Sequence, residues 1–110
     1  MLFRSQVKVL LGDDNPFSRN GLRALLQTCP SLDLIGVAQD GAHALSLVQD
    51  CTPDVVLLDV KMPKINGLQA ARRIKERWPG VRVILISMYR GYEPSAYDAG
   101  ADFFFVKGAS

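Results

Sequence analysis

The chain has 110 residues, of which 48% are hydrophobic and 22% are charged, and its formal net charge is +2. These values predict one globular domain and exclude wholesale disorder, and so small a charge does not by itself indicate binding to nucleic acid or to a membrane surface. The longest apolar runs are too short to cross a bilayer, and residues 1–6 lack the layout of a signal peptide. Cys29 and Cys51 have no metal-ligand spacing, so we expect two free thiols and a cytoplasmic protein.

Two strand–helix units are predicted in the first half of the chain. Residues 7–11 form a short apolar strand, and Asn15 and Pro16 then suit the start of a helix that ends near Pro30. Residues 32–38 read as a second strand, whose aspartate and glycine suggest a peripheral place in the sheet. A second helix follows over residues 42–48.

The chain is organised around the third predicted strand, residues 55–59, with the sequence Val-Val-Leu-Leu-Asp. A continuous apolar run of this length is typical of a strand that is buried on both faces of a parallel sheet. Open α/β sheets bind their ligands at the carboxyl ends of such strands. Asp59, the last residue of the run, is therefore the first candidate for a functional side chain.

The second half continues the alternation of strands and helices. A loop with two strong breakers leads from Asp59 into a third helix, which Pro79-Gly80 ends. The remaining elements are a strand over residues 81–87, a loop over 88–92, a short helix over 94–99 and a strand over 102–107. Strict alternation predicts a parallel sheet with right-handed crossovers and helices on both faces.

Polar side chains follow four of the five predicted strands, and all of them should meet at one edge of the sheet. They are Asp13 and Asp14, Asp59, Ser87 and Lys107. Three converging carboxylates repel one another unless a cation neutralises them, and oxygen ligands of this kind suit Mg²⁺. A lysine and a hydroxyl can hold two further oxygens of an anion, so the site is suited to phosphoryl transfer to an aspartate.

These residues resemble the receiver domain of two-component response regulators over nearly the whole chain. The similarity rests on several motifs that occur in the expected order: Leu11-Gly12-Asp13-Asp14, Val56 to Pro63, Asn66-Gly67, Leu85-Ile86-Ser87, and Ala99-Gly100-Ala101 followed by Phe104 and Lys107. The resemblance implies a flavodoxin-like three-layer α/β sandwich with a five-stranded parallel sheet of order 2-1-3-4-5.

The resemblance also implies a role for each matching residue. Asp59 corresponds to the phosphoacceptor, which receives its phosphoryl group from a sensor histidine kinase. Mg²⁺ would be held by Asp13, Asp14, Asp59 and the backbone carbonyl of Lys61. Ser87 and Lys107 would contact the phosphoryl group, and Phe104 falls at the aromatic position whose rotamer follows the hydroxyl in the phosphorylation switch.

The chain departs from the family pattern near its end. The segment between Ser87 and Gly100 is about half a helical turn short, so the fourth helix should be short, and a fifth helix is missing. We therefore expect a C-terminally incomplete receiver domain over residues 1–110, with apolar surface exposed beside the last strand, and a homodimer or swapped oligomer is one way to cover it. The ending Gly108-Ala109-Ser110 is similar to the NarL/FixJ branch, whose members usually carry a C-terminal DNA-binding domain; DNA contact would need that domain, which this chain lacks.

Two other functions remain open. The chain could be a degenerate or stand-alone receiver that acts as a protein-interaction module, or a small phosphohydrolase with an aspartate nucleophile. The absence of a lid segment in the sequence counts against the hydrolase. Tyr89, two residues after Ser87, either gates the access of water to the phosphate or is an exposed loop tyrosine.

Overall fold

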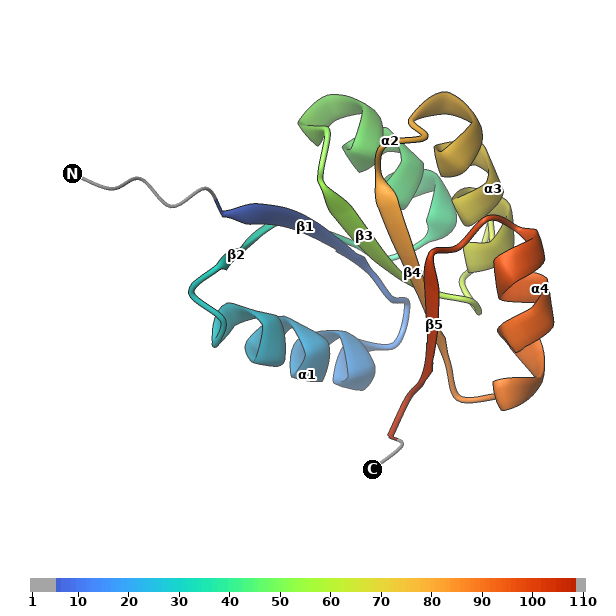
Figure 1. Ribbon diagram of the computed structural model, residues 1–110. Helices are drawn as coiled ribbons and strands as arrows, with labels where there is room; N and C mark the ends of the chain where they lie inside the picture. The colour runs from blue at the N-terminus through green and yellow to red at the C-terminus, as the bar shows by residue number, and fades with distance from the viewer. Residues whose placement is uncertain (1–5, 109–110) are drawn as a thin grey trace.

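The computed structural model describes residues 6–108, in which five parallel strands alternate with four α-helices (Figure 1). The strands are β1 (Val7–Gly12), β2 (Leu32–Ala38), β3 (Val55–Asp59), β4 (Arg82–Ser87) and β5 (Phe103–Val106). The α-helices are α1 (Pro16–Gln27), α2 (Gly41–Cys51), α3 (Gly67–Arg77) and α4 (Glu93–Asp98). Residues 1–5, and the last two residues of the Gly108-Ala109-Ser110 ending used above, lie outside the described part.

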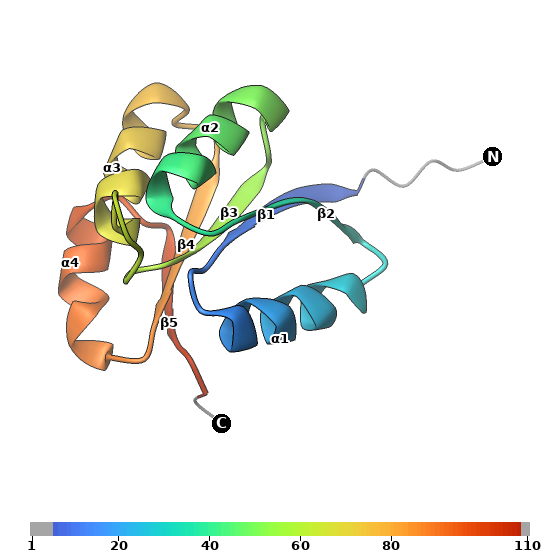
Figure 2. The same ribbon diagram turned by 180° about the vertical axis from the view of Figure 1, so that it is seen from behind.

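The strands are all parallel, as their alternation with helices predicted, and they pair in the order β2-β1-β3-β4-β5 that the family resemblance implied. β2 is an edge strand, in agreement with its weaker apolar character. α2, α3 and α4 cover one face of the sheet and α1 lies on the other (Figures 1 and 2). The structure therefore confirms the three-layer flavodoxin-like arrangement.

The main hydrophobic core lies between the sheet and the layer formed by α2, α3 and α4. Alternate residues of the inner strands face it, because successive side chains of a strand point to opposite sides. Its fully buried members from β1, β3 and β4 are Leu10, Val56, Leu58, Val83 and Leu85, and small residues of the helices, among them Ala44, Ala71 and Ala96, pack against them. Full burial of each large side chain is worth about 1.5–3 kcal/mol, so this layer holds the strands in register.

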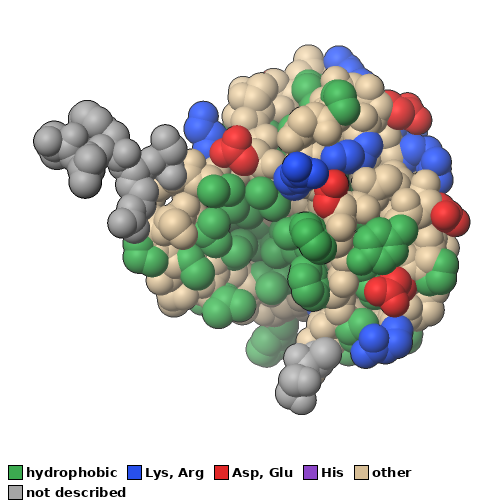
Figure 3. Space-filling model, in the orientation of Figure 1, with side chains coloured by type: hydrophobic (Ala, Val, Ile, Leu, Met, Phe, Trp, Pro, Cys, Tyr) green, Lys and Arg blue, Asp and Glu red, His purple; other side chains and the backbone are tan. Residues whose placement is uncertain are grey.

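The opposite face of the sheet is only partly covered, and here α1 differs from the expected amphipathic core helix. Leu22 and Leu26 are only half-buried, and α1 contributes no fully buried side chain. Phe103 and Phe105 on β5 are 55% and 57% exposed, and their rings stack at 6.5 Å. Figure 3 shows hydrophobic side chains gathered over this face, between α1 and β5. The expected apolar surface beside the last strand is therefore present.

The segment after β4 is compact, and α4 is short, as predicted. α4 has six residues, with Pro94 in its first turn. Residues Arg90–Tyr92, where the sequence predicted a loop, form one 3₁₀ turn, because the Tyr92 N–H donates to the carbonyl of Tyr89 at 3.3 Å. Between β5 and Gly108, where the described residues end, no helix follows.

Two close backbone approaches position the site at the carboxyl ends of the strands. A Cβ atom at Gly67 would lie 2.2 Å from the carbonyl oxygen of Asp59, so the start of α3 can reach the end of β3 only with glycine there. A Cβ atom at Gly41, at the start of α2, would lie 1.8 Å from the carbonyl oxygen of Ile65, so this approach also needs glycine. No helix within residues 6–108 has the length and apolar character needed to span a membrane.

Candidate functional site

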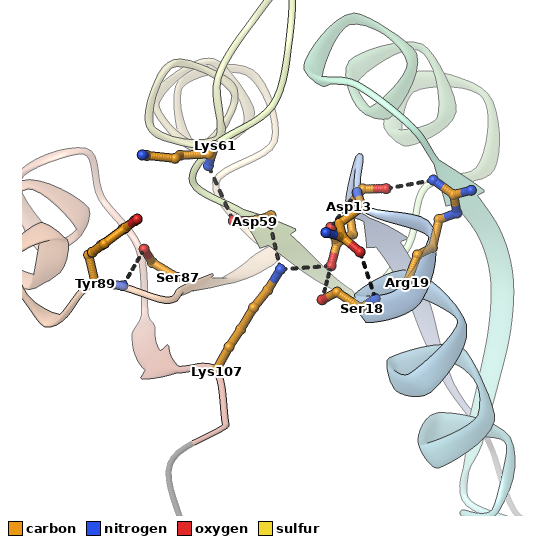
Figure 4. A network of polar contacts seen from close by, with 9 residues as sticks. Asp13, Ser18, Arg19, Asp59, Lys61, Ser87, Tyr89 and Lys107 are labelled. Carbon is orange, nitrogen blue, oxygen red and sulfur yellow. Dashed lines mark hydrogen bonds and ion pairs between the residues drawn. The ribbon is translucent and has the colours of Figure 1, made fainter.

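The polar residues that follow the strands come together at one edge of the sheet (Figure 4). Asp13 follows β1, Asp59 and Ser87 end β3 and β4, and Lys107 follows β5. These four strands are neighbours in the sheet, so their ends meet. The strand ends and the loops that follow them enclose a cleft of about 280 Å³. Its lining residues are Asp14, Asn15, Asp59, Lys61, Ser87, Met88, Tyr89 and Lys107.

Three carboxylates lie in this cluster, at different depths. Asp13 is completely buried, Asp59 is 7% exposed, and Asp14 is open to solvent. One oxygen of each lies within 4.8 Å of those of the other two. Hard oxygen ligands at this spacing, with one side open to water, fit a magnesium ion, which keeps several of its waters when bound.

Lys107 joins the two buried carboxylates. Its Nζ lies 2.6 Å from Oδ2 of Asp59 and 3.0 Å from Oδ2 of Asp13, and its side chain is only 13% exposed. One ammonium group thus faces two buried carboxylates, with the third carboxylate of Asp14 close by. The cluster keeps a net negative charge that a further cation would neutralise.

The pKa values of the pair reflect this arrangement. Burial raises the pKa of the Asp59 carboxyl above its ordinary value, although the hydrogen bond from Lys107 opposes that shift. Burial works against the charge of Lys107, but its hydrogen bonds to Asp59 and Asp13 outweigh burial and raise the pKa of the ammonium group. Lys107 is therefore held as a cation beside the carboxylate of Asp59.

Ser87 lies in the cleft but is turned toward its own loop. It is 1% exposed, and its Oγ accepts a hydrogen bond from the Tyr89 backbone N–H at 3.0 Å. Among the described residues, its Oγ forms no hydrogen bond with Asp59 or Lys107, whereas the backbone N–H of Lys107 donates to the Ser87 carbonyl at 2.8 Å. A hydroxyl that accepts one bond still has its hydrogen free to donate, so Ser87 can serve an anion in the cleft.

Lys61, Tyr89 and Phe104 surround the cluster. The backbone N–H of Lys61 donates to Oδ1 of Asp59 at 3.2 Å, and its Nζ lies 4.5 Å from the centre of the Tyr89 ring. The Tyr89 side chain is 56% exposed. Phe104 is 8% exposed and belongs to the main core, on the opposite face of the sheet from Phe103 and Phe105.

The sequence interpretation missed two side chains from the first turn of α1. Oγ of Ser18 donates to Oδ2 of Asp13 at 2.5 Å, and Nη1 of Arg19 donates to the Asp13 carbonyl oxygen at 3.0 Å (Figure 4). A signal was available, because a helix predicted to begin directly after an acidic pair places its first polar side chains beside those acids.

Comparisons with known proteins agree with this geometry. The family model described as the response regulator receiver domain matches residues 9–110. A protein-glutamate methylesterase/protein-glutamine glutaminase of Pyrococcus horikoshii is 48% identical over 86 residues, which are 78% of this chain and 23% of that protein. The response regulator GacA of Pseudomonas aeruginosa is 35% identical over 105 residues, 94% of this chain and 49% of GacA. The chain thus spans about half the length, or less, of these curated relatives.

Solved structures give the same result. The signal receiver domain of the response regulator NarL from Mycobacterium tuberculosis has a TM-score of 0.91 and 36% identity, and the match covers 96% of this chain and 87% of that one. The response regulator domain of Thermotoga maritima CheB has a TM-score of 0.86 and 31% identity, and the match covers 96% of this chain and 81% of that one. On the family match and these similarities, the chain belongs to the response regulator receiver domain family.

Proposed function

We propose that Asp59 accepts a phosphoryl group from the phosphohistidine of a sensor histidine kinase, and that the domain works as a regulatory switch rather than as an enzyme. The observation that supports this most strongly is the convergence of Asp13, Asp14 and Asp59 with Lys107 at the ends of neighbouring strands. An acid-rich cluster with one internal cation is suited to binding a metal and a phosphoryl group together.

In the transfer step, an oxygen of the Asp59 carboxylate attacks phosphorus while the P–N bond of the donor breaks. The electron pair of that bond stays on the imidazole nitrogen, and an acyl phosphate forms on Asp59. Lys107 already lies 2.6 Å from Oδ2 of Asp59, so its ammonium group can pair with a phosphoryl oxygen after a small movement. Ser87, buried at the same edge, donates its hydroxyl hydrogen to another phosphoryl oxygen.

Asp13, Asp14, Asp59 and the backbone carbonyl of Lys61 are the groups that would hold Mg²⁺. When bound, the ion neutralises carboxylate and phosphoryl charge. Without the ion, the ammonium group of Lys107 neutralises part of the negative charge of Asp13 and Asp59.

The switch that we propose links Ser87 to the face formed by α4 and β5. Ser87 leaves its bond with the Tyr89 N–H to reach the phosphoryl group, and Phe104, which pairs with Leu85 in the neighbouring strand, follows in the core. Phosphorylation must bind one of two conformations better than the other for this movement to carry a signal.

The output is proposed from the relatives. Two relatives named as transcriptional regulatory proteins, DegU of Brevibacillus brevis and LnrK of Bacillus subtilis, match 94% of this chain at 30% and 31% identity. We infer control of transcription through a DNA-binding domain outside this chain, with self-association of the receiver domain as the step that the switch controls. The receiver domain itself is regulatory.

Phosphorylation of purified protein tests the proposal. Acetyl phosphate with Mg²⁺ should label the parent once per chain and should not label the Asp59→Asn variant. Asp50→Asn, which removes an exposed carboxylate from α2, is the matched control and should label like the parent. Chelation of Mg²⁺ should abolish labelling in every case. An Asp59→Asn protein that labels like the parent would sink the assignment.

The same preparation separates a switch from a phosphohydrolase. A switch releases inorganic phosphate only as slowly as its own acyl phosphate decays, whereas a hydrolase turns over a phosphomonoester many times. Sustained turnover of a phosphomonoester that depends on Asp59 would favour the hydrolase.

A further inference from the structure

Asp13 is the most deeply buried carboxylate of the site, and its oxygens are held by three donors. The Asn15 backbone N–H donates to Oδ1 at 3.0 Å, while Ser18 Oγ and Lys107 Nζ donate to Oδ2 at 2.5 Å and 3.0 Å. A buried carboxylate needs such partners because it has lost its contact with water.

In the proposed function, Lys107 moves away from Asp13 when Asp59 is phosphorylated. The proposed function requires its ammonium group to follow Asp59 and the phosphoryl group, and its bond to Asp59 at 2.6 Å is already shorter than its bond to Asp13 at 3.0 Å. When Lys107 moves, the Ser18 hydroxyl is the side-chain donor that stays on Oδ2 of Asp13.

Ser18 is itself fixed in place. Its backbone N–H donates to the side chain of Asn15, which caps α1, at 3.1 Å. The next residue, Arg19, donates to the backbone carbonyl of Asp13 at 3.0 Å. The first turn of α1 therefore forms hydrogen bonds with both the carboxylate and the backbone carbonyl of Asp13.

From these contacts we propose that Ser18 is a positioning residue for the magnesium site, acting through Asp13. This inference rests on the proposed function, because it takes Asp13 as one of the groups that hold the ion. The hydroxyl bond orients the Asp13 carboxylate toward Asp14 and Asp59 and keeps it there when Lys107 leaves. Partners that orient metal-binding carboxylates in this way typically contribute a factor of about 10–100 to metal affinity.

A purely structural role for Ser18 predicts something different. The residue lies in the first turn of α1, and alanine is the best helix former, so Ser18→Ala should leave the helix intact. If Ser18 only supported α1, the substitution would shift the melting temperature and leave the affinity for Mg²⁺ unchanged.

The test is a Mg²⁺ titration of the folded protein, followed through the amide resonances of its NMR spectrum. Ser18→Ala should raise the dissociation constant for Mg²⁺ by about tenfold or more. Ser18→Thr, which keeps the hydroxyl, should restore the parent value, and Asn20→Ala, which removes an exposed side chain of the same helix, should not change it. Ser18→Cys keeps the size but donates poorly, so it serves if the alanine variant does not fold.

A second measurement separates positioning from chemistry. With acetyl phosphate as donor, the Mg²⁺ concentration for half-maximal labelling of Ser18→Ala should rise by the same factor, while the rate at saturating Mg²⁺ stays near that of the parent. A Ser18→Ala or Ser18→Cys protein that binds Mg²⁺ as tightly as the parent would overturn the role of Ser18 alone. A parent protein that does not bind Mg²⁺ at all would overturn the metal assignment and this inference together.

Discussion

Two ion-pair networks in this domain, one at the strand ends and one nearer the surface, combine carboxylates and cations in opposite proportions. The strand-end network consists of Asp13, Asp59 and Lys107, so that two carboxylates share one ammonium group. The Asp102 network consists of Asp102, Lys75 and Arg82, so that one carboxylate meets two cations. The strand-end network therefore has more negative than positive charge, whereas the Asp102 network has more positive than negative charge.

The Asp102 network ties α3 to β4 and to the start of β5. Oδ2 of Asp102 accepts from Lys75 Nζ at 3.1 Å and from the Val83 backbone N–H at 2.8 Å. Lys75 Nζ also donates to the carbonyls of Pro79 and Val81, at 3.2 Å and 2.9 Å. Every charge in it has its hydrogen bonds, which is typical of a group that stabilises the fold.

The pKa shifts of the two aspartates have opposite signs. Burial raises the pKa of Asp59, whereas at Asp102 the bonds from the Val83 N–H, Lys75 and Arg82 outweigh burial and lower the pKa of the carboxyl. Asp102 therefore contributes stability above the ordinary aspartate pKa, and this contribution is lost as the pH falls through its lowered value. Ionised Asp59 costs stability at neutral pH, and acid removes that cost. The two aspartates therefore differ in how pH affects their contribution to stability: the ionised form of Asp59 is disfavoured by burial, and that of Asp102 is favoured by its hydrogen bonds.

The largest expected effect comes from removing the cation of the strand-end network. Lys107→Met leaves Asp13 and Asp59 buried without an ion-pair partner, and breaking such a buried pair typically costs about 3–5 kcal/mol. The loss should appear in urea unfolding with a chelator present, and Mg²⁺ should restore part of it. Lys64→Met is the control, because Lys64 forms only an exposed pair with Asp40 at 3.6 Å and should change stability by less than about 1 kcal/mol. If Lys107→Met and Lys64→Met lose the same free energy of unfolding, Lys107 is not an essential partner of the two buried carboxylates.

A smaller loss is expected from the Asp102 network. Asp102→Ala removes the acceptor of the Lys75 and Val83 donors, and hydrogen bonds to a charged group are worth about 1.5–3 kcal/mol. The difference from the parent should shrink as the pH falls below the ordinary aspartate value, as measured by thermal unfolding. Phosphorylation of Asp59 should be unaffected. Asp98→Ala, at an exposed position of α4, provides the matched control and should be nearly neutral.

Removing the charge of Asp59 should increase the stability of the fold, in contrast to the two substitutions above. Asp59→Asn removes a carboxylate whose ionised form is unfavourable in the fold, so the free energy of unfolding at pH 7 should rise, by on the order of 1 kcal/mol. The gain should disappear in acid, where the parent carboxyl is protonated as well. A variant that is less stable than the parent at pH 7 would show that Asp59 is instead a net stabilising group.

The smallest effect concerns the edge of the cleft. Nζ of Lys61 lies over the Tyr89 ring at 4.5 Å, and an exposed contact of this kind is worth about 0.5–1 kcal/mol. If the pair shields the acyl phosphate from water, Tyr89→Ala should shorten the phosphoryl lifetime by about twofold to fivefold. Tyr89→Phe keeps the ring and should decay like the parent. Identical lifetimes for all three proteins would mark Tyr89 as an exposed loop tyrosine only.

The residue pattern alone determined the alternation of parallel strands and helices and which residues meet at the site, whereas the strand order came from the family resemblance. Apolar runs and turn residues identified all five strands, and strict alternation implied that their carboxyl ends share one edge, which brought Asp13, Asp59 and Lys107 together. These inferences succeed because strand periodicity and the handedness of crossovers are local rules. For the same reason the shortened α4 could be predicted from spacing and from Pro94.

The tertiary structure decided the contacts that depend on which face of an element packs against what. Only the folded chain shows that Lys107 bridges two carboxylates, that Ser18 holds Asp13, and that α1 buries none of its apolar residues fully. The 3₁₀ turn before α4 also escaped the sequence interpretation. Each of these features depends on the distance between side chains of different elements, or on one weak local hydrogen bond, and neither leaves a periodic signal in the sequence.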